Sequence, residues 1–154
     1  RAGDAFNVLP QTATLKGTVR TLNKSTQDLI ERRMTEIING ICSMHEAKSH
    51  FIYERGYPVT SNHDVQAQFA AKTASEVVGG DKVDTNLTPT MGAEDFSYML
   101  EARPGAFIFI GNGRGPDGKA HSVHTPMFNF NDAVIPMGVE YWVSLVQHEL
   151  NLAG

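Results

Sequence analysis

Residues 12–21 read Thr-Ala-Thr-Leu-Lys-Gly-Thr-Val-Arg-Thr, and apolar and polar side chains alternate along this stretch. Ala13, Leu15 and Val19 share one face of an extended chain, which is the period-two pattern of a half-buried strand. A second stretch of similar character, residues 50–54, is followed by Gly-Tyr-Pro. The pattern predicts two strands, at 12–21 and at 50–54.

The segment between these two strands has helical periodicity. Ser25 is followed three residues later by Asp28, which is close to a capping box. Six apolar residues then recur with the spacing of one helix face: Leu29, Ile30, Met34, Ile37, Ile38 and Ile41. The spacing predicts an amphipathic helix over 26–45, and therefore a β-α-β order for the first third of the chain.

The rest of the chain combines helical patterns with one apolar strand. Residues 106–110 form a continuous apolar run of strand length, which is typical of a strand buried on both faces. Three helices are predicted from apolar spacing, capping residues and the stop at Gly79-Gly80, over 63–78, 93–101 and 133–151. The order of elements predicts an α/β fold (α+β overall), with a seam between two parts near residues 57–62.

Composition excludes several classes of protein. The chain has 154 residues, of which 41% are hydrophobic and 19% charged, as in globular domains rather than disordered chains or coiled coils. Its net charge of −4 gives no reason to expect a nucleic acid or an anionic membrane as partner. The single cysteine, Cys42, cannot form an internal disulfide, and no apolar run approaches the ~18–20 residues that span a bilayer, so we expect a cytoplasmic protein. The chain begins with Arg1 rather than Met, and we expect that residue 1 is not the natural start.

Residues 113–118 spell G-x-G-x-x-G after the strand predicted at 106–110. A dinucleotide site needs a helix directly after the last glycine, because the helix N-terminus binds the pyrophosphate. Residues 119–126 have no helical pattern. The glycines therefore indicate a flexible loop, and a nucleotide-binding domain is disfavoured.

Several isolated polar residues leave alternatives open. His121 and His124 are either surface-loop histidines or sources of a metal ligand, since a metal site needs three or four ligands. Glu94 stands at the start of a predicted helix, where a carboxylate contributes about 0.3–1 kcal/mol, or it lines a substrate site. Arg20 is either a solvated strand arginine or a bidentate partner for a carboxylate. A local metal site formed by His121, His124, Glu94 and Asp132 is a further hypothesis.

Four blocks of the sequence, taken together and in order, resemble one enzyme family. They are Phe6–Pro10 with Gly17–Thr21, then Thr90–Tyr98, Arg103–Asn112 and His124–Asp132. Their order and spacing are similar to those of the zinc aminoacylase, carboxypeptidase G and hippurate hydrolase family. The match is best with its amidohydrolase branch, which includes bacterial hippurate hydrolases and plant auxin-conjugate hydrolases.

The resemblance implies part of a two-domain enzyme. Residues 1–57 would be half of a ferredoxin-like β-α-β lid, which often dimerises, and residues 58–154 the C-terminal section of an α/β catalytic domain. The family hydrolyses the amide bond of N-acyl amino acids with two divalent ions, zinc or manganese, that activate a water molecule, and a glutamate shuttles the proton. With only parts of two domains present, we expect exposed apolar faces on the 26–45 helix and the 106–110 strand.

The resemblance also implies roles for individual residues. His124 matches the family's last metal ligand, bound as a neutral imidazole. Asn7 and Arg20 match lid positions that bind the substrate, and Gly92 and Glu94 match a turn that lines the substrate site. The family's other metal ligands, its catalytic glutamate and a lid histidine all precede Asn7 in the family's order. We therefore expect no catalytic residue in this chain and no amide hydrolysis by the chain alone. The alternative is a non-catalytic module for dimerisation or ligand binding.

Overall fold

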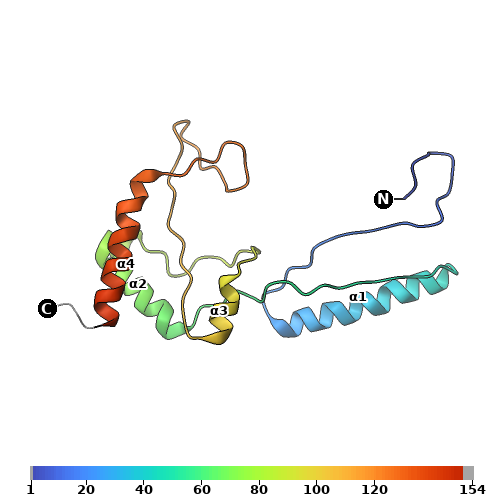
Figure 1. Cartoon of the computed structure of the whole chain (residues 1–154), viewed down its shortest axis with the longest axis horizontal. Coiled ribbons are helices and arrows are strands. Elements are labelled where there is room, and N and C mark those ends of the chain that lie inside the picture. The colour runs from blue at the N-terminus through green and yellow to red at the C-terminus, as the bar shows by residue number, and fades with distance from the viewer. Residues whose placement is uncertain (1, 151–154) are drawn as a thin grey trace. The chain divides into compact units, whose positions relative to one another are not determined.

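The computed structural model describes residues 2–150, which form helices joined by long non-helical segments (Figure 1). The helices in chain order are α1 (Lys24–Met44), α2 (Asp64–Val78), the 3₁₀ helix η1 (Gly80–Lys82), α3 (Phe96–Ala102), the 3₁₀ helix η2 (Asp132–Val134) and α4 (Ile135–Glu149). The chain divides into two compact units, Arg1–Val59 and Thr60–Gly154. None of the described helices is both long and apolar enough to cross a membrane. The lid and catalytic identities predicted for the two parts stay predictions.

The four predicted helices are confirmed, with small shifts at their ends. Asn23 rather than Ser25 caps α1: its Oδ1 accepts a hydrogen bond from the backbone N–H of Thr26 at 2.8 Å, and the Ser25 hydroxyl donates to the same oxygen. Gly79 ends α2 with φ of 89°, a conformation that favours glycine. The predicted end of the last helix at residue 151 lies outside the described residues.

The predicted α/β fold with a β-α-β lid is wrong, because residues 2–150 contain helices and no strand. The stretch 12–21 runs as coil before α1, and the stretches 50–54 and 106–110 run as coil between helices (Figure 1). Alternating side chains favour an extended chain, but a strand also needs a second chain segment that pairs with its backbone N–H and C=O groups. No backbone–backbone hydrogen bond joins these stretches to one another or to any other extended segment within residues 2–150. Their local pattern is therefore present without the non-local pairing that makes a sheet.

In the first unit, side-chain bonds hold residues 49–55 along α1. The Ser49 hydroxyl donates to Oδ1 of Asn39 at 2.6 Å. At the other end, the Arg55 guanidinium pairs with Oδ1 of Asp28 at 2.7 Å and donates through Nε to Oε2 of Glu31 at 2.8 Å. Hydrogen bonds to Glu31, and then to Asp28, raise the pKa of Arg55. The segment is thus fixed at both ends by polar side chains, while its backbone has no ladder partner.

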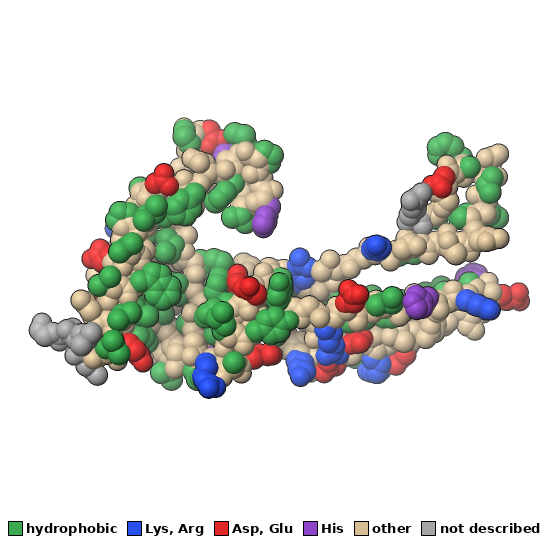
Figure 2. All heavy atoms as spheres, in the orientation of Figure 1, with side chains coloured by type: hydrophobic (Ala, Val, Ile, Leu, Met, Phe, Trp, Pro, Cys, Tyr) green, Lys and Arg blue, Asp and Glu red, His purple; other side chains and the backbone are tan. Residues whose placement is uncertain are grey.

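Apolar side chains of α1 and of the 106–110 stretch face solvent, as expected. On α1, Ile41 is 56% exposed and Met44 79% exposed. In the second unit, Phe109 is 66% exposed, and α4 carries a further exposed apolar residue, Trp142, at 61%. Figure 2 shows many hydrophobic side chains on the visible surface over α4. Exposed apolar side chains that gather on one face are typical of a surface that is covered by another part of a protein.

The core of the second unit lies where α2 packs against α4. Thr73 of α2 is fully buried, and its Oγ1 lies 3.3 Å from Nδ1 of His148 on the last turn of α4. The other ring nitrogen of His148 lies 3.3 Å from Oε2 of Glu76 on α2. Tyr141 is buried in the same contact, and burial raises the pKa of its hydroxyl. His148 therefore ties the end of α4 to two residues one turn apart on α2.

The buried Thr73 hydroxyl gives a test of this packing. Thr73→Val keeps the volume and the β-branched shape but leaves Nδ1 of His148 without its partner, while the contact of Nε2 with Glu76 stays. We expect a loss of about 1–2 kcal/mol in the free energy of unfolding, the usual effect of removing one partner of a buried hydrogen bond. Urea unfolding followed by circular dichroism measures it. Thr35→Val on α1, where the hydroxyl is exposed, is the matched control. Equal effects of the two variants contradict the assigned contact.

Candidate functional site

The five predicted site residues are divided between the two units. Asn7 and Arg20 belong to the first unit, lie outside its helix and are exposed. Gly92, Glu94 and His124 belong to the second unit. Each is therefore described in its own surroundings, and the roles predicted for all five stay predictions.

Glu94 lies at the start of α3, and its polar groups bind the first turn of this helix. Its carbonyl oxygen accepts hydrogen bonds from the Ser97 hydroxyl at 2.6 Å and from the Ser97 backbone N–H at 3.2 Å. Its carboxylate oxygen Oε1 accepts from the backbone N–H of Phe96 at 3.3 Å. Gly92, two residues earlier, is exposed, and a Cβ built there would approach only Thr90 Oγ1, at 3.9 Å. This contact fits a carboxylate at a helix start, and it leaves the second carboxylate oxygen available to a substrate, so both predicted roles of Glu94 stay predictions.

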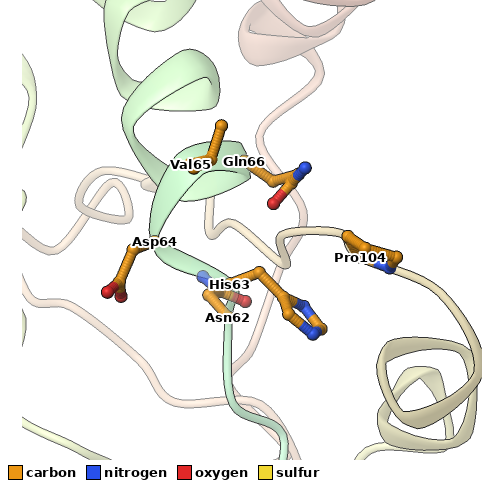
Figure 3. A pocket seen from close by; sticks show the side chains of 6 residues that line it. All are labelled: Asn62, His63, Asp64, Val65, Gln66 and Pro104. Atoms are coloured by element: carbon orange, nitrogen blue, oxygen red, sulfur yellow. The ribbon is translucent and has the colours of Figure 1, made fainter.

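The start of α2 borders a shallow open hollow (Figure 3). Asn62 Nδ2 donates to the carbonyl of Phe107 at 2.8 Å, and Asn62 Oδ1 accepts from the N–H of the same residue at 2.7 Å. His63 bonds Gly105 through its backbone and its ring: its backbone N–H donates to the Gly105 carbonyl, and its ring Nδ1 accepts from the Gly105 N–H at 3.2 Å. The Asn62 amide thus binds both backbone groups of Phe107, as the backbone of a neighbouring strand would.

The glycine-rich segment 113–118 folds into a turn rather than a helix start. The N–H of Gly115 donates to the Lys119 carbonyl at 2.8 Å, and the N–H of Gly118 donates to the Gly115 carbonyl at 2.9 Å. The next described helix is η2, at residues 132–134. No helix directly follows the last glycine, so the segment does not have the geometry by which a helix N-terminus binds a pyrophosphate.

His121 is bound within this turn rather than facing a ligand site. Its Nε2 lies 2.8 Å from Oδ2 of Asp117, and Oδ1 of Asp117 accepts from the backbone N–H of Lys119 at 3.1 Å. The Lys119 amide, and then His121, lower the pKa of Asp117. Asp117 therefore holds the turn together through both of its carboxylate oxygens.

His124 is exposed and has an unusual backbone conformation. Its φ is 65°, in the left-handed region that costs a non-glycine residue about 1–3 kcal/mol and that recurs at functional sites. Turn bonds flank it: the Thr125 hydroxyl donates to the Ser122 carbonyl at 2.9 Å, and the Phe128 N–H donates to the Thr125 carbonyl at 3.1 Å. Its imidazole makes no hydrogen bond to any other described residue. The ring is thus free to bind a group from outside the second unit.

The described residues do not form a complete metal site. Across residues 2–150, no three or more histidine, cysteine, aspartate or glutamate side chains come together as a group that could hold an ion. The hypothesis of a local site made by His121, His124, Glu94 and Asp132 therefore gains no support. His124 can supply at most one of the three or four ligands that a zinc ion takes.

Comparison with known proteins decides the family. The model of peptidase family M20/M25/M40 matches residues 8–148, which include both units. This chain belongs to the M20/M25/M40 peptidase family. The resemblance to its amidohydrolase branch is confirmed by relatives whose names describe amidohydrolases and a hippurate hydrolase.

Three relatives illustrate the match to this M20/M25/M40 chain. A Bacillus subtilis protein named as an amidohydrolase, YhaA, is 35% identical over 131 residues, covering 85% of this chain and 33% of its own length. Hippurate hydrolase of Campylobacter jejuni is 31% identical over 144 residues, which cover 94% of this chain and 36% of its own length. IAA-amino acid hydrolase ILR1-like 2 of Arabidopsis thaliana is 32% identical over 148 residues, which cover 93% of this chain and 33% of its own length. The chain spans about a third of the length of these relatives. No solved structure matches the chain.

The Asp117 contacts predict how the 113–121 turn responds to pH. A carboxyl group whose pKa is lowered on folding stabilises the fold above its unfolded pKa of about 3.9, and this contribution is lost as pH falls through the folded pKa. We expect the Lys119 amide to become more exchange-labile and to shift as pH falls below about 4. Two-dimensional NMR across this range measures both effects. Asp117→Asn keeps an acceptor for Lys119 but does not titrate, so a low-pH step that persists in this variant assigns the effect to another group.

Proposed function

We propose that this chain is part of a metal-dependent amidohydrolase that cleaves the amide bond of N-acyl amino acids. The family match over residues 8–148 is the observation that carries the proposal. Among the relatives, one is named for hippurate and another for IAA-amino acids, and both names describe an acid joined to an amino acid through an amide. The whole-protein reaction is part of the proposal, since the chain spans about a third of these relatives.

In this proposal His124 binds one of two divalent ions, zinc or manganese. When bound, the ions supply a lowered pKa for water and a positive charge for the developing oxyanion. The support from the geometry is a free, exposed imidazole on a strained backbone within a long loop. The other ligands and the catalytic glutamate come from outside the described residues, so we expect the chain alone to be inactive.

Arg20 and Asn7 bind the polar end of the substrate in this proposal. Arg20 is exposed, and its guanidinium presents a fork of donors that fits a carboxylate in two hydrogen bonds. The turn at Gly92 and Glu94 lines the substrate, with Gly92 leaving room beside its backbone. This division of roles places carboxylate recognition on the first unit and the metal ligand on the second.

Dimerisation through the first unit and a cytoplasmic location complete the proposal. The exposed apolar face of α1 and the stretch 50–54, whose backbone forms no strand pair within residues 2–150, support a contact with a second copy. Cys42, the single cysteine, supports a reducing compartment. The same exposed face of α1 also favours the alternative function, a dimerisation or ligand-binding module without catalysis. Hydrolysis of hippurate by a full-length enzyme carrying this chain separates the two functions.

His124→Ala in such a full-length enzyme tests the ligand assignment. We expect kcat/KM for hippurate to fall by at least about 100-fold and the bound metal to decrease, because changes even beyond the ligands themselves cost 10–100-fold. Elemental analysis and initial rates provide the readouts. His121→Ala, which removes a histidine bound to Asp117, is the matched control. Normal metal content and turnover in His124→Ala contradict the proposed role.

Arg20→Ala tests the carboxylate contact. A clamp that acts equally on substrate and transition state sets KM, so we expect KM to rise about tenfold with kcat nearly unchanged. The control is Arg32→Ala, which removes an exposed arginine of α1 that pairs with Glu36. A series of substrates with and without the free carboxylate sharpens the test. If KM rises equally for substrates with and without the free carboxylate, Arg20 does not recognise the carboxylate.

A further inference from the structure

The loop that carries His124 is long and is closed at its base by one side chain. Residues 113–128 contain neither helix nor strand, and loops of this length inside a compact unit usually serve a function. At the base, Asn112 Nδ2 donates to the Asn129 carbonyl at 2.8 Å, and Asn112 Oδ1 accepts from the Asn131 N–H at 2.8 Å. One amide side chain thus binds backbone groups on both sides of residue 130.

A second asparagine in the same unit uses the same chemistry in another place. Asn62 binds the N–H and the carbonyl of Phe107, at 2.7 and 2.8 Å. In both cases an amide, which has a donor and an acceptor side by side, replaces a neighbouring strand. The Asn112 bonds close the loop that carries His124, whereas the Asn62 bonds join the ends of a longer segment that contains α2, α3 and the predicted site residues Gly92 and Glu94. The pair therefore offers a comparison between a bond that shapes the His124 loop and an equivalent bond that does not.

Hydrogen bonds joined by short backbone segments lead from Asn112 to the residues on either side of His124. Asn112 holds the carbonyl of Asn129, whose chain neighbour Phe128 donates to the Thr125 carbonyl at 3.1 Å. The Thr125 hydroxyl in turn donates to the Ser122 carbonyl at 2.9 Å, so that turn bonds enclose His124. A left-handed backbone at a histidine persists only where surrounding bonds fix it. Loss of the two Asn112 bonds would leave the Asn129 end of these bonds without a fixed position.

We propose that Asn112 is a positioning residue for His124: it closes the 113–128 loop and thereby fixes the direction in which the imidazole is presented. Asn112 itself does not touch substrate or metal in this proposal. The role of His124 as a ligand rests on the proposed function, whereas its placement by Asn112 does not.

Asn112→Asp tests the proposal on this chain without any metal. The variant keeps an oxygen that accepts from the Asn131 N–H, but it replaces the donor with an oxygen that faces the Asn129 carbonyl. Asn62→Asp makes the same change at the equivalent bond to Phe107 and is the matched control. Asn112→Ala, which removes both bonds without adding charge, is the second variant, and helicity by circular dichroism verifies folding in each case.

Two readouts follow the loop directly. The first is the rate of trypsin cleavage after Arg114 and Lys119, located by mass spectrometry. Loss of one or two net hydrogen bonds should raise this rate at least five- to tenfold, on the order expected for about 1 kcal/mol per bond. The second is the NMR signal of the His124 imidazole and amide, which should move toward random-coil values in both Asn112 variants while His148 keeps its position.

The Asn62→Asp control shows whether the effect is specific to the loop that carries His124 or is a general loosening of the second unit. The proposal is supported if Asn62→Asp leaves the cleavage rates and the His124 signals as in the unchanged chain. It is overturned if the Asn112 variants leave them unchanged, or if Asn62→Asp alters them equally. Failure of the metal-ligand role would be seen separately, as normal metal content in the full-length His124→Ala enzyme, and would leave these two readouts unaffected.

Discussion

Backbone N–H and C=O groups must find partners, and the way this chain meets that requirement shapes both of its units. Helices satisfy it locally, through bonds between residues four apart. The extended stretches cannot satisfy their backbone groups locally. At several points, polar side chains bind or hold these stretches where a neighbouring strand would otherwise do so. Asn62 serves Phe107, Asn112 serves Asn129 and Asn131, and Ser49 and Arg55 fix their segment to side chains of α1. The helices therefore satisfy their backbone groups internally, whereas the extended segments at 49–55, 107 and 129–131 depend on a few specific side chains.

The same distinction explains which parts of the fold the sequence could predict. Helix α1 is determined by its own residues, since apolar spacing and a polar cap lie within the segment, and even there the cap is Asn23 rather than Ser25. The stretch at 106–110 has every local feature of a buried strand. What makes a strand is a partner backbone, and nothing in the run of Ala106–Ile110 specifies where that partner lies. The strand predictions were wrong because the local pattern of a segment does not say whether another segment will pair with its backbone.

For the candidate site, sequence reasoning identified residues but not their surroundings. The block that begins at His124 predicted a functional position, yet the left-handed backbone of that histidine depends on turn bonds that no spacing rule describes. The structure shows the ring of His121 bound to Asp117, a contact that the sequence spacing did not predict. Asn112 was missed as a functional residue. The available signal was an Asn-Gly pair at the end of an apolar run, which indicates a turn but does not reveal that the asparagine closes a loop.

The predicted site residues lie mainly where the chain is least determined by local sequence. Arg20 ends an unpaired stretch, and His124 lies in a loop without regular structure. A residue on α4 keeps its direction because the helix fixes it, but a loop histidine keeps its direction only if bonds outside its own segment hold the loop. Exposed apolar faces on α1 and at Phe109 show that further contacts are also needed to cover both units. If His124 is a ligand, its position on such a loop lets it meet groups from another part of a protein, and in our proposal its direction then depends on Asn112, which closes the loop at its base.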